Sequence, residues 1–257
     1  MPYAERDGLR LYYERAGQGE LELLFVPGWC CDHTFYEPQF EHFKASHAVT
    51  ALDPRGCGAS DVPEDGYDIP ILADDLAWLC EEVGIVKPVV IGHSLGGMIA
   101  IELAARHPAL PRAVVSDDPG PIHPIEEATA IFRAFVAAMA GPRGEDARRA
   151  WVMDGVGRTA DDELGRKIVD TMCSVPLPIA AAMIRGVVEW NGVGALRLCG
   201  VPLLILNPAG RSNDPWRLRP LKPDLHVGAT VGAGHFHQLE VPEQVNAMIE
   251  RFLAIAI

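Results

Sequence analysis

Positive charge, targeting signals and long apolar runs are scarce in this 257-residue chain, and their scarcity excludes several functions. The chain has 22 Lys and Arg against 35 Asp and Glu, a net charge of -13, and no block of basic residues. Nucleic acids and anionic membranes are therefore poor partners. The N-terminal stretch MPYAERDGLRLYYERAG has no apolar segment of the kind found in signal peptides, and polar residues such as Glu22 and Glu102 interrupt the longest apolar stretches. We therefore expect a soluble, cytoplasmic protein.

Cysteines are few and lack the spacing of a disulfide framework or a metal site. The six are Cys30, Cys31, Cys57, Cys80, Cys173 and Cys199, and no C-x-x-C pair occurs among them. Reduced thiols are the expectation. The one tight histidine pair, His235 and His237, has no acidic or cysteine cluster beside it, so no metal and no cofactor is predicted.

What the chain does contain is the alternation of an α/β protein. Hydrophobic residues make up 49% and charged residues 22%, enough for one substantial core. Short apolar runs bounded by Gly, Pro and Asp alternate with amphipathic segments, which predicts a mostly parallel sheet. Strands are predicted over 9–17, 21–28, 48–54, 88–94, 112–118, 202–207 and 225–232. We expect the first two to pair as an antiparallel edge and the others to be buried and parallel. Helices are predicted over 69–84, 96–108 and 241–256.

The strand pattern disappears between Gly120 and about Leu198. The segment reads as three or four helices broken by Gly and Pro, which predicts a helical insertion between two strands. The expected division is therefore a core of residues 1–120 and 199–257 with a helical cap over 121–198.

A Gly-x-Ser-x-Gly pattern centres on Ser94. It follows a predicted buried strand and precedes a predicted helix, in the stretch VVIGHSLGGM. At such a corner small residues allow the helix to pack close to the strand, and the serine hydroxyl projects away from the core. The pattern in this setting predicts that Ser94 is a nucleophile.

Four segments together resemble the α/β-hydrolase family over essentially the full length. They are FVPGWCCD, LDPRGCGASDVP, GHSLGG and GAGHFHQLEVPEQV. The resemblance implies a mostly parallel eight-stranded sheet flanked by helices, with a helical cap. It also implies that His235 is the base, that His237 is structural or lines the pocket, and that the backbone amides of Trp29 and Leu95 form the oxyanion hole. The Pro27-Gly28-Trp29 start of the first segment departs from the family's common His-Gly.

The acidic partner of the histidine is less clearly marked. The usual family position falls on Arg211 or close to it, and Asp214 lies some three residues late. Some members, including certain haloalkane dehalogenases, zearalenone lactone hydrolases and cofactor-free quinolone dioxygenases, take the acid from the end of an earlier strand, which matches Asp118 here. We therefore predict Asp118, with Asp214 as the alternative. Asp117 is expected to point to the other side and to bond loop backbone.

Three functions are compatible with these residues. The first is hydrolysis of an ester or lactone through Ser94, His235 and Asp118, with an acyl-enzyme. A serine at the elbow argues against dehalogenase and epoxide hydrolase chemistry, which uses a carboxylate nucleophile. The alternative is a cofactor-independent dioxygenase acting on a hydroxylated heteroaromatic, because the stretch LLFVPGWCCDHTFY resembles the corresponding loop of that group. A non-catalytic binding module is the third.

The insertion also suggests the type of substrate. Its large apolar residues predict an apolar chamber, although helix packing would require some of the same side chains: Ile131, Phe132, Phe135, Met139, Trp151, Met153, Met183 and Trp190. An uncharged small-molecule ester or lactone is therefore expected, acted on by a monomer or homodimer.

Overall fold

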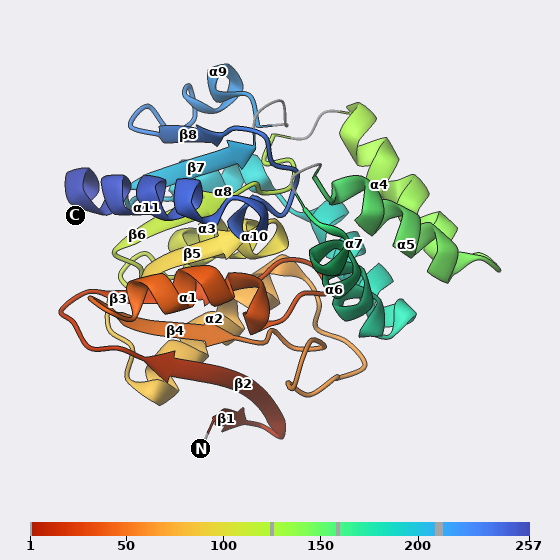
Figure 1. The fold of residues 1–257 in the computed structure, drawn as a ribbon, viewed down its shortest axis with the longest axis horizontal. Helices are drawn as coiled ribbons and strands as arrows, with labels where there is room; N and C mark the ends of the chain where they lie inside the picture. The colour runs from red at the N-terminus through yellow and green to blue at the C-terminus, as the bar shows by residue number, and fades with distance from the viewer. Residues whose placement is uncertain (1, 124–125, 158–159, 209–212) are drawn as a thin grey trace.

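The computed structural model describes residues 2–123, 126–157, 160–208 and 213–257. Its centre is an eight-stranded sheet in the order β1-β2-β4-β3-β5-β6-β7-β8 (Figure 1). The strands are β1 Tyr3–Arg6, β2 Leu9–Ala16, β3 Glu22–Val26, β4 Ala48–Leu52, β5 Val89–His93, β6 Ala113–Asp117, β7 Leu203–Pro208 and β8 His226–Thr230. From β4 onward every neighbouring pair in this order is parallel, which confirms the predicted mostly parallel sheet.

The predicted antiparallel pairing of the first two sequence segments is wrong. β2 pairs antiparallel with β1 and β4, whereas β3 lies between β4 and β5 and is parallel to both. The reason is burial: residues Leu23 to Val26 are fully buried, as in a central strand with helices on both faces. The missed strand β1 is joined to β2 by Asp7 and Gly8, both at positive φ, and Asp-Gly is a strong two-residue hairpin signal.

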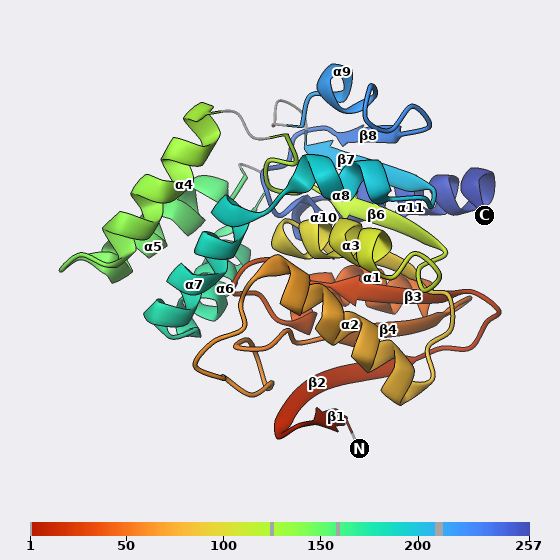
Figure 2. The same ribbon diagram turned by 180° about the vertical axis from the view of Figure 1, so that it is seen from behind.

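Helices cover both faces of the sheet. The helices α2 Ile69–Val83, α3 Leu95–Arg106 and α8 Gly192–Leu198 lie on one face, which is nearest the viewer in Figure 2. The helices α1 Glu37–Phe43, which follows the 3-10 turn η1 His33–Tyr36, and α11 Pro242–Ala256 lie on the other (Figure 1). Each face has its own buried apolar cluster, so the sheet separates two core layers.

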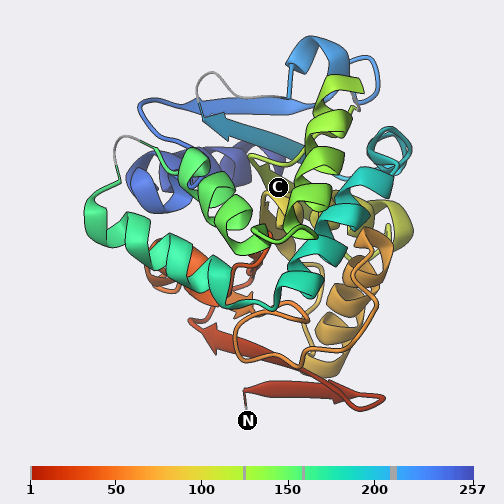
Figure 3. The same cartoon turned by 90° about the vertical axis from the view of Figure 1, so that its right-hand side faces the viewer.

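The insertion between β6 and β7 is helical, as predicted. It comprises α4 Glu126–Met139, α5 Gly144–Gly155, α6 Asp162–Ser174 and α7 Leu177–Glu189, followed by α8. Figure 1 shows α4 to α7 gathered at one side of the sheet, and Figure 3 looks onto them from that side; these helices pack on one another. The unpredicted helix α8 packs on α3 instead.

Two short helices follow the last strands. They are α9 Pro215–Leu218 and α10 His237–Glu240. In the part of the chain that the structure describes, no single helix is long and apolar enough to cross a membrane; α6 and α7 reach that length only together, with a 94° bend between them.

Candidate active site

Ser94 sits on a strained corner between β5 and α3. Its backbone has φ 52° and ψ -114°, a conformation that costs a non-glycine residue of order 1–3 kcal/mol. Glycines make the corner possible: a Cβ on Gly92 would lie 2.1 Å from the Gly96 carbonyl oxygen, and one on Gly96 would lie 2.2 Å from that of Val26. The strand and helix therefore approach closely, and Ser94 is left at the start of α3.

The structure brings Ser94, His235 and Asp118 together. The Nε2 atom of His235 lies 3.0 Å from the Ser94 hydroxyl oxygen, and its Nδ1 atom lies 2.5 Å from Oδ2 of Asp118. Asp118 is 2% exposed and follows β6 at φ 39°, with its backbone N–H donating to the Leu206 carbonyl at 2.6 Å. Such an array can deprotonate the serine hydroxyl while the carboxylate orients the imidazole.

Asp214, the alternative acid, lies elsewhere. Its exposed side chain caps α9 by accepting a hydrogen bond from the Trp216 N–H at 2.9 Å. This is an ordinary N-cap role for an aspartate. Arg211, where the usual family position falls, lies outside the described residues.

Asp117 and His237 form a second acid–histidine pair on the other side of the β6 end. Oδ1 of Asp117 and Nε2 of His237 form an ion pair, and both side chains are buried. Burial lowers the pKa of His237, but Asp117 and other nearby carboxylates leave it raised. Asp117 therefore does point away from Asp118, but its partner is a histidine side chain and not the predicted loop backbone. His237 does not line the pocket.

His93, within the Gly-x-Ser-x-Gly stretch, is a functional-site residue that sequence reasoning missed. Its Nε2 lies 2.8 Å from the backbone oxygen of His235, and the two rings lie 4.6 Å apart. Burial is the main cause that holds the pKa of His93 well below its ordinary value, so the ring is neutral and donates through Nε2. His93 occupies the variable position before the serine in Gly-x-Ser-x-Gly, which carries no sequence signal for this contact.

The two amides predicted to bind an oxyanion belong to the start of α3 and to the loop that follows β3. Leu95 is the first residue of α3, and the first N–H groups of a helix have no intrahelical acceptor. Trp29 follows β3, and its indole N–H donates to the Ala180 carbonyl of α7 at 2.9 Å. The Trp29 ring also packs edge-on against Phe135 of α4. The loop that carries the Trp29 amide is thus attached to the insertion.

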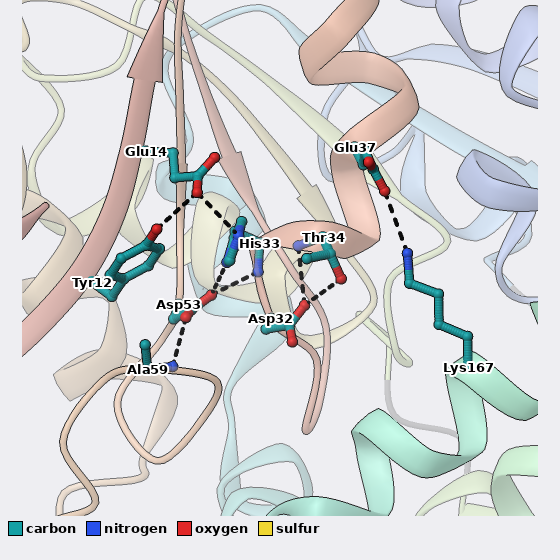
Figure 4. A network of polar contacts seen from close by, with 9 residues as sticks. All are labelled: Tyr12, Glu14, Asp32, His33, Thr34, Glu37, Asp53, Ala59 and Lys167. Carbon is teal, nitrogen blue, oxygen red and sulfur yellow. Dashed lines mark hydrogen bonds and ion pairs between the residues drawn. The ribbon is translucent and has the colours of Figure 1, made fainter.

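A polar network fixes the far end of the same loop (Figure 4). The buried carboxylate of Asp53 accepts hydrogen bonds from the His33 backbone N–H at 2.7 Å and the Ala59 N–H at 2.8 Å, and it also contacts the His33 ring at 2.7 Å. Glu14 lies 3.5 Å from the other nitrogen of that ring. The Asp53 hydrogen bond raises the pKa of His33, and burial opposes it.

A cavity of about 420 Å³ opens in front of Ser94. Among the apolar residues predicted from the insertion, Ile131, Phe132 and Trp151 line it. Phe135 stacks on Trp151 at 4.2 Å, and Trp190 bonds Glu102 at 2.8 Å, so these two serve helix packing. Further lining residues come from the loops after β3, β6 and β8 and from helices α3 to α7: Trp29, Cys31, Met98, Pro119, Gly120, Pro121, Ala128, Val152, Gly155, Met172, Ile184, Val187 and Phe236.

The cavity lining has little charge. Of the described residues that line it, none is Lys or Arg, and Asp154 is the one carboxylate besides Asp118. Likewise, no group of three or more His, Cys, Asp and Glu within the described ranges could hold a metal ion.

Comparisons with known proteins match the observed fold. The family model described as alpha/beta hydrolase fold matches residues 23–150. A curated 2-(acetamidomethylene)succinate hydrolase of Mesorhizobium japonicum is 34% identical over 110 residues, which are 43% of this chain and 39% of that protein. Mouse epoxide hydrolase 4 is 36% identical over 106 residues, 40% of this chain and 30% of that protein. The chain thus spans well under half of these relatives' length.

Solved structures extend the likeness to the whole chain. The enol-lactonase from Burkholderia xenovorans LB400 superimposes with a TM-score of 0.86 at 18% identity, covering 98% of this chain and 100% of that one. A thermophilic esterase from Thermogutta terrifontis gives a TM-score of 0.84 at 24% identity, covering 98% and 96%. At these identities the match establishes the architecture.

Proposed function

Because this chain belongs to the α/β-hydrolase fold superfamily, we propose that it is a serine-dependent hydrolase of a small to medium uncharged ester or lactone. One observation carries the proposal: the Ser94 hydroxyl lies 3.0 Å from His235, whose other ring nitrogen lies 2.5 Å from the buried Asp118. A hydroxyl, a base and an orienting carboxylate in that sequence are what acyl transfer requires.

The proposed reaction has two halves. His235 takes the Ser94 proton as the oxygen attacks the substrate carbonyl, and the Trp29 and Leu95 amides stabilise the resulting oxyanion. The tetrahedral intermediate collapses, His235 returns the proton to the leaving alcohol, and an acyl-enzyme remains. Water activated by His235 then releases the acid. Asp118 keeps its charge throughout and stabilises the imidazolium.

The lining of the cavity supports an uncharged substrate. A carboxylate group on the substrate would need a cation for efficient binding, and the described lining offers neither Lys nor Arg. A dianion such as the substrate named for the Mesorhizobium relative therefore fits this cavity poorly. The ester and lactone substrates named for several structural neighbours fit better.

The insertion acts as the cap of this site. Helices α4 to α7 each contribute to the cavity wall, so substrate is enclosed between them and the sheet. The cap also holds the loop that carries His235, because the backbone N–H of His235 donates to the Gly155 carbonyl of α5 at 2.8 Å.

The test is intact-protein mass spectrometry after treatment with a fluorophosphonate. We expect a single adduct on the wild type and none on Ser94→Ala. Ser46→Ala is a matched control, because the Ser46 hydroxyl lies 2.8 Å from His47 Nδ1 on the exposed surface. Loss of the adduct in Ser46→Ala, or a folded wild type that remains unlabelled, overturns the proposal. In the second case, oxygen uptake with a hydroxylated heteroaromatic tests the alternative dioxygenase reaction.

A further inference from the structure

Two segments supply two acid–histidine pairs that lie back to back. Asp117 ends β6 and Asp118 follows it; His235 and His237 flank Phe236. Asp118 pairs with His235 toward the cavity, and Asp117 pairs with His237 away from it. The second pair is the more deeply buried, with Asp117 and His237 both 0% exposed. The reaction described above makes no use of it.

The adjacent carboxylates create an electrostatic problem. Asp117 and Asp118 are consecutive and almost fully buried, and two buried like charges in close proximity push one of them toward protonation unless a cation compensates. His235 cannot be that cation, because it must be neutral to accept the Ser94 proton. His237 is the remaining candidate among the described neighbours.

The surroundings of His237 favour the imidazolium form. Its Nδ1 lies 2.9 Å from the Thr230 hydroxyl, which can accept a hydrogen bond, and its Nε2 faces Asp117. The other titratable groups that act on this pair are Asp118, Glu240 and Tyr36, with the rings of His93 and His235 next to it. The carboxylates raise the pKa of His237, and the Tyr36 hydroxyl, buried beside Asp117, has its own pKa raised mainly by burial.

We propose that His237 is a positioning residue which, as an imidazolium against Asp117, neutralises one of the two adjacent carboxylates so that the charge of Asp118 acts on His235. The inference rests on the proposed function of Ser94, His235 and Asp118. It assigns to the second histidine of the GHFH stretch a charge that the first histidine cannot carry between turnovers.

The first test reads the charge of His237 directly. Nitrogen-15 NMR of the histidine side chains, assigned with His237→Gln, distinguishes imidazolium from neutral imidazole. At pH 7.5 we expect the wild type to show His237 with both nitrogens protonated and His235 neutral. In Asp117→Asn we expect His237 to be neutral, because a buried cation without its anion is unfavourable. A neutral His237 in the wild type overturns the proposal. This readout is independent of activity, so it separates failure of the pairing from failure of the proposed hydrolysis.

The second test reads the effect on His235. The acidic limb of the rate of fluorophosphonate labelling against pH reports loss of the His235 proton. His237→Gln should move this limb to higher pH by about one unit, because an uncompensated carboxylate favours the His235 imidazolium. The double variant Asp117→Asn with His237→Gln should restore the wild-type limb. His42→Gln, which makes the same substitution at an exposed histidine paired with Glu250, should leave the limb in place.

A purely structural role gives a different pattern. Equal losses of labelling in His237→Gln and in the double variant, with an unshifted limb in both, would refute the electrostatic role. The electrostatic role is also refuted if His237→Gln is fully active and the acidic limb of its labelling rate lies at the same pH as in the wild type. If His237→Gln does not fold, the histidine signals are assigned by through-bond experiments on the wild type, and the charge of His237 measured there still decides the question.

Discussion

The Asp118 carboxylate lies 2.5 Å from His235 across 117 residues of sequence, a contact made because β6 ends beside the loop that follows β8. The backbone of Asp118 is held there by its N–H bond to Leu206 and by a left-handed φ of 39°. The competing candidate, Asp214, is used as a helix cap. We therefore expect substitution of Asp118 and substitution of Asp214 to have opposite consequences for activity.

Asp118→Asn should lower kcat on a p-nitrophenyl ester by roughly 10³–10⁴-fold, because an amide no longer holds the correct tautomer or stabilises the imidazolium. Asp214→Asn should stay within about twofold of wild type, because asparagine also caps helices well. Steady-state rates on both purified variants check this, with circular dichroism to verify folding. A large loss in Asp214→Asn with little loss in Asp118→Asn would reverse the assignment.

Trp29→Phe should lower kcat about tenfold and leave KM nearly unchanged. Phenylalanine keeps the ring contact with Phe135 but loses the 2.9 Å bond to Ala180 that attaches the oxyanion loop to α7. A displaced Trp29 amide weakens stabilisation of the transition state and has little effect on binding of the substrate, so kcat falls while KM is kept. A tenfold loss of kcat corresponds to about 1.4 kcal/mol. Trp190→Phe is the matched control, because its indole N–H bonds Glu102 away from the cavity. Equal kinetic effects in both variants would point to general loosening of the insertion.

Much of the fold was readable because hydrophobic periodicity reports burial. The parallel strands and the helices α2, α3 and α11 follow directly from it, and the insertion is visible as a region without strand signals. Strand order is a different matter, since β3 pairs with β4 and β5, which lie further along the chain. Pairing partners depend on crossover helices that periodicity does not describe, which is why the antiparallel edge was misassigned.

The candidate site could be predicted from the sequence where the backbone geometry requires a particular residue type. Glycines are required around Ser94, since a side chain at Gly92 or Gly96 would overlap neighbouring backbone. The contact of His93 with the His235 carbonyl, and the pairing of Asp117 with His237, leave no comparable mark, because any polar residue fits the pattern at those positions. Such contacts become visible only when distant segments are placed side by side.

The contribution of His33 to stability should decline as pH rises. Its hydrogen bond to Asp53 raises the folded-state pKa above the ordinary value of 6.5, so the charged pair stabilises fully below that value and is lost as pH rises through the folded pKa. Thermal unfolding of wild type and His33→Gln should therefore differ more at pH 5.5 than at pH 9. A contribution of about 1 kcal/mol for this partly exposed ring would shift Tm by about 2–4 °C.

His42→Gln is the control for the previous prediction. His42 pairs with Glu250 at 2.7 Å, but both side chains are largely exposed, at 43% and 55%. Exposed pairs of this kind contribute little to stability, so the Tm of His42→Gln should stay close to that of the wild type at both pH values. A Tm difference for His33→Gln that grows toward alkaline pH would contradict the assigned charge state.

Neutral esters should be turned over far better than anionic ones of equal size. Between p-nitrophenyl butyrate and the p-nitrophenyl monoester of succinate, we expect kcat/KM to differ by at least about tenfold, since burying an unpaired carboxylate is costly. The absence of Lys and Arg from the described lining carries the prediction. Asp154→Asn should narrow the gap, because it removes a negative charge from the cavity wall. A preference for the succinate ester would show that a cation reaches the bound substrate.

Gly96→Ala should abolish labelling by fluorophosphonate and destabilise the fold, whereas Gly200→Ala should do neither. A Cβ on Gly96 would lie 2.2 Å from the Val26 carbonyl oxygen and 2.5 Å from that of Pro27, so α3 must move away from the end of β3. That movement separates Ser94 and the Leu95 amide from Trp29, which follows Pro27 by two residues. At Gly200 a Cβ meets nothing within 4 Å, and alanine there reduces the entropy of the unfolded chain. Chemical denaturation and labelling of both variants check the contrast. A stable Gly96→Ala protein that still reacts with fluorophosphonate would mean that α3 can move away from β3 without disturbing Ser94. That result would contradict the proposal that close packing at this corner positions the nucleophile.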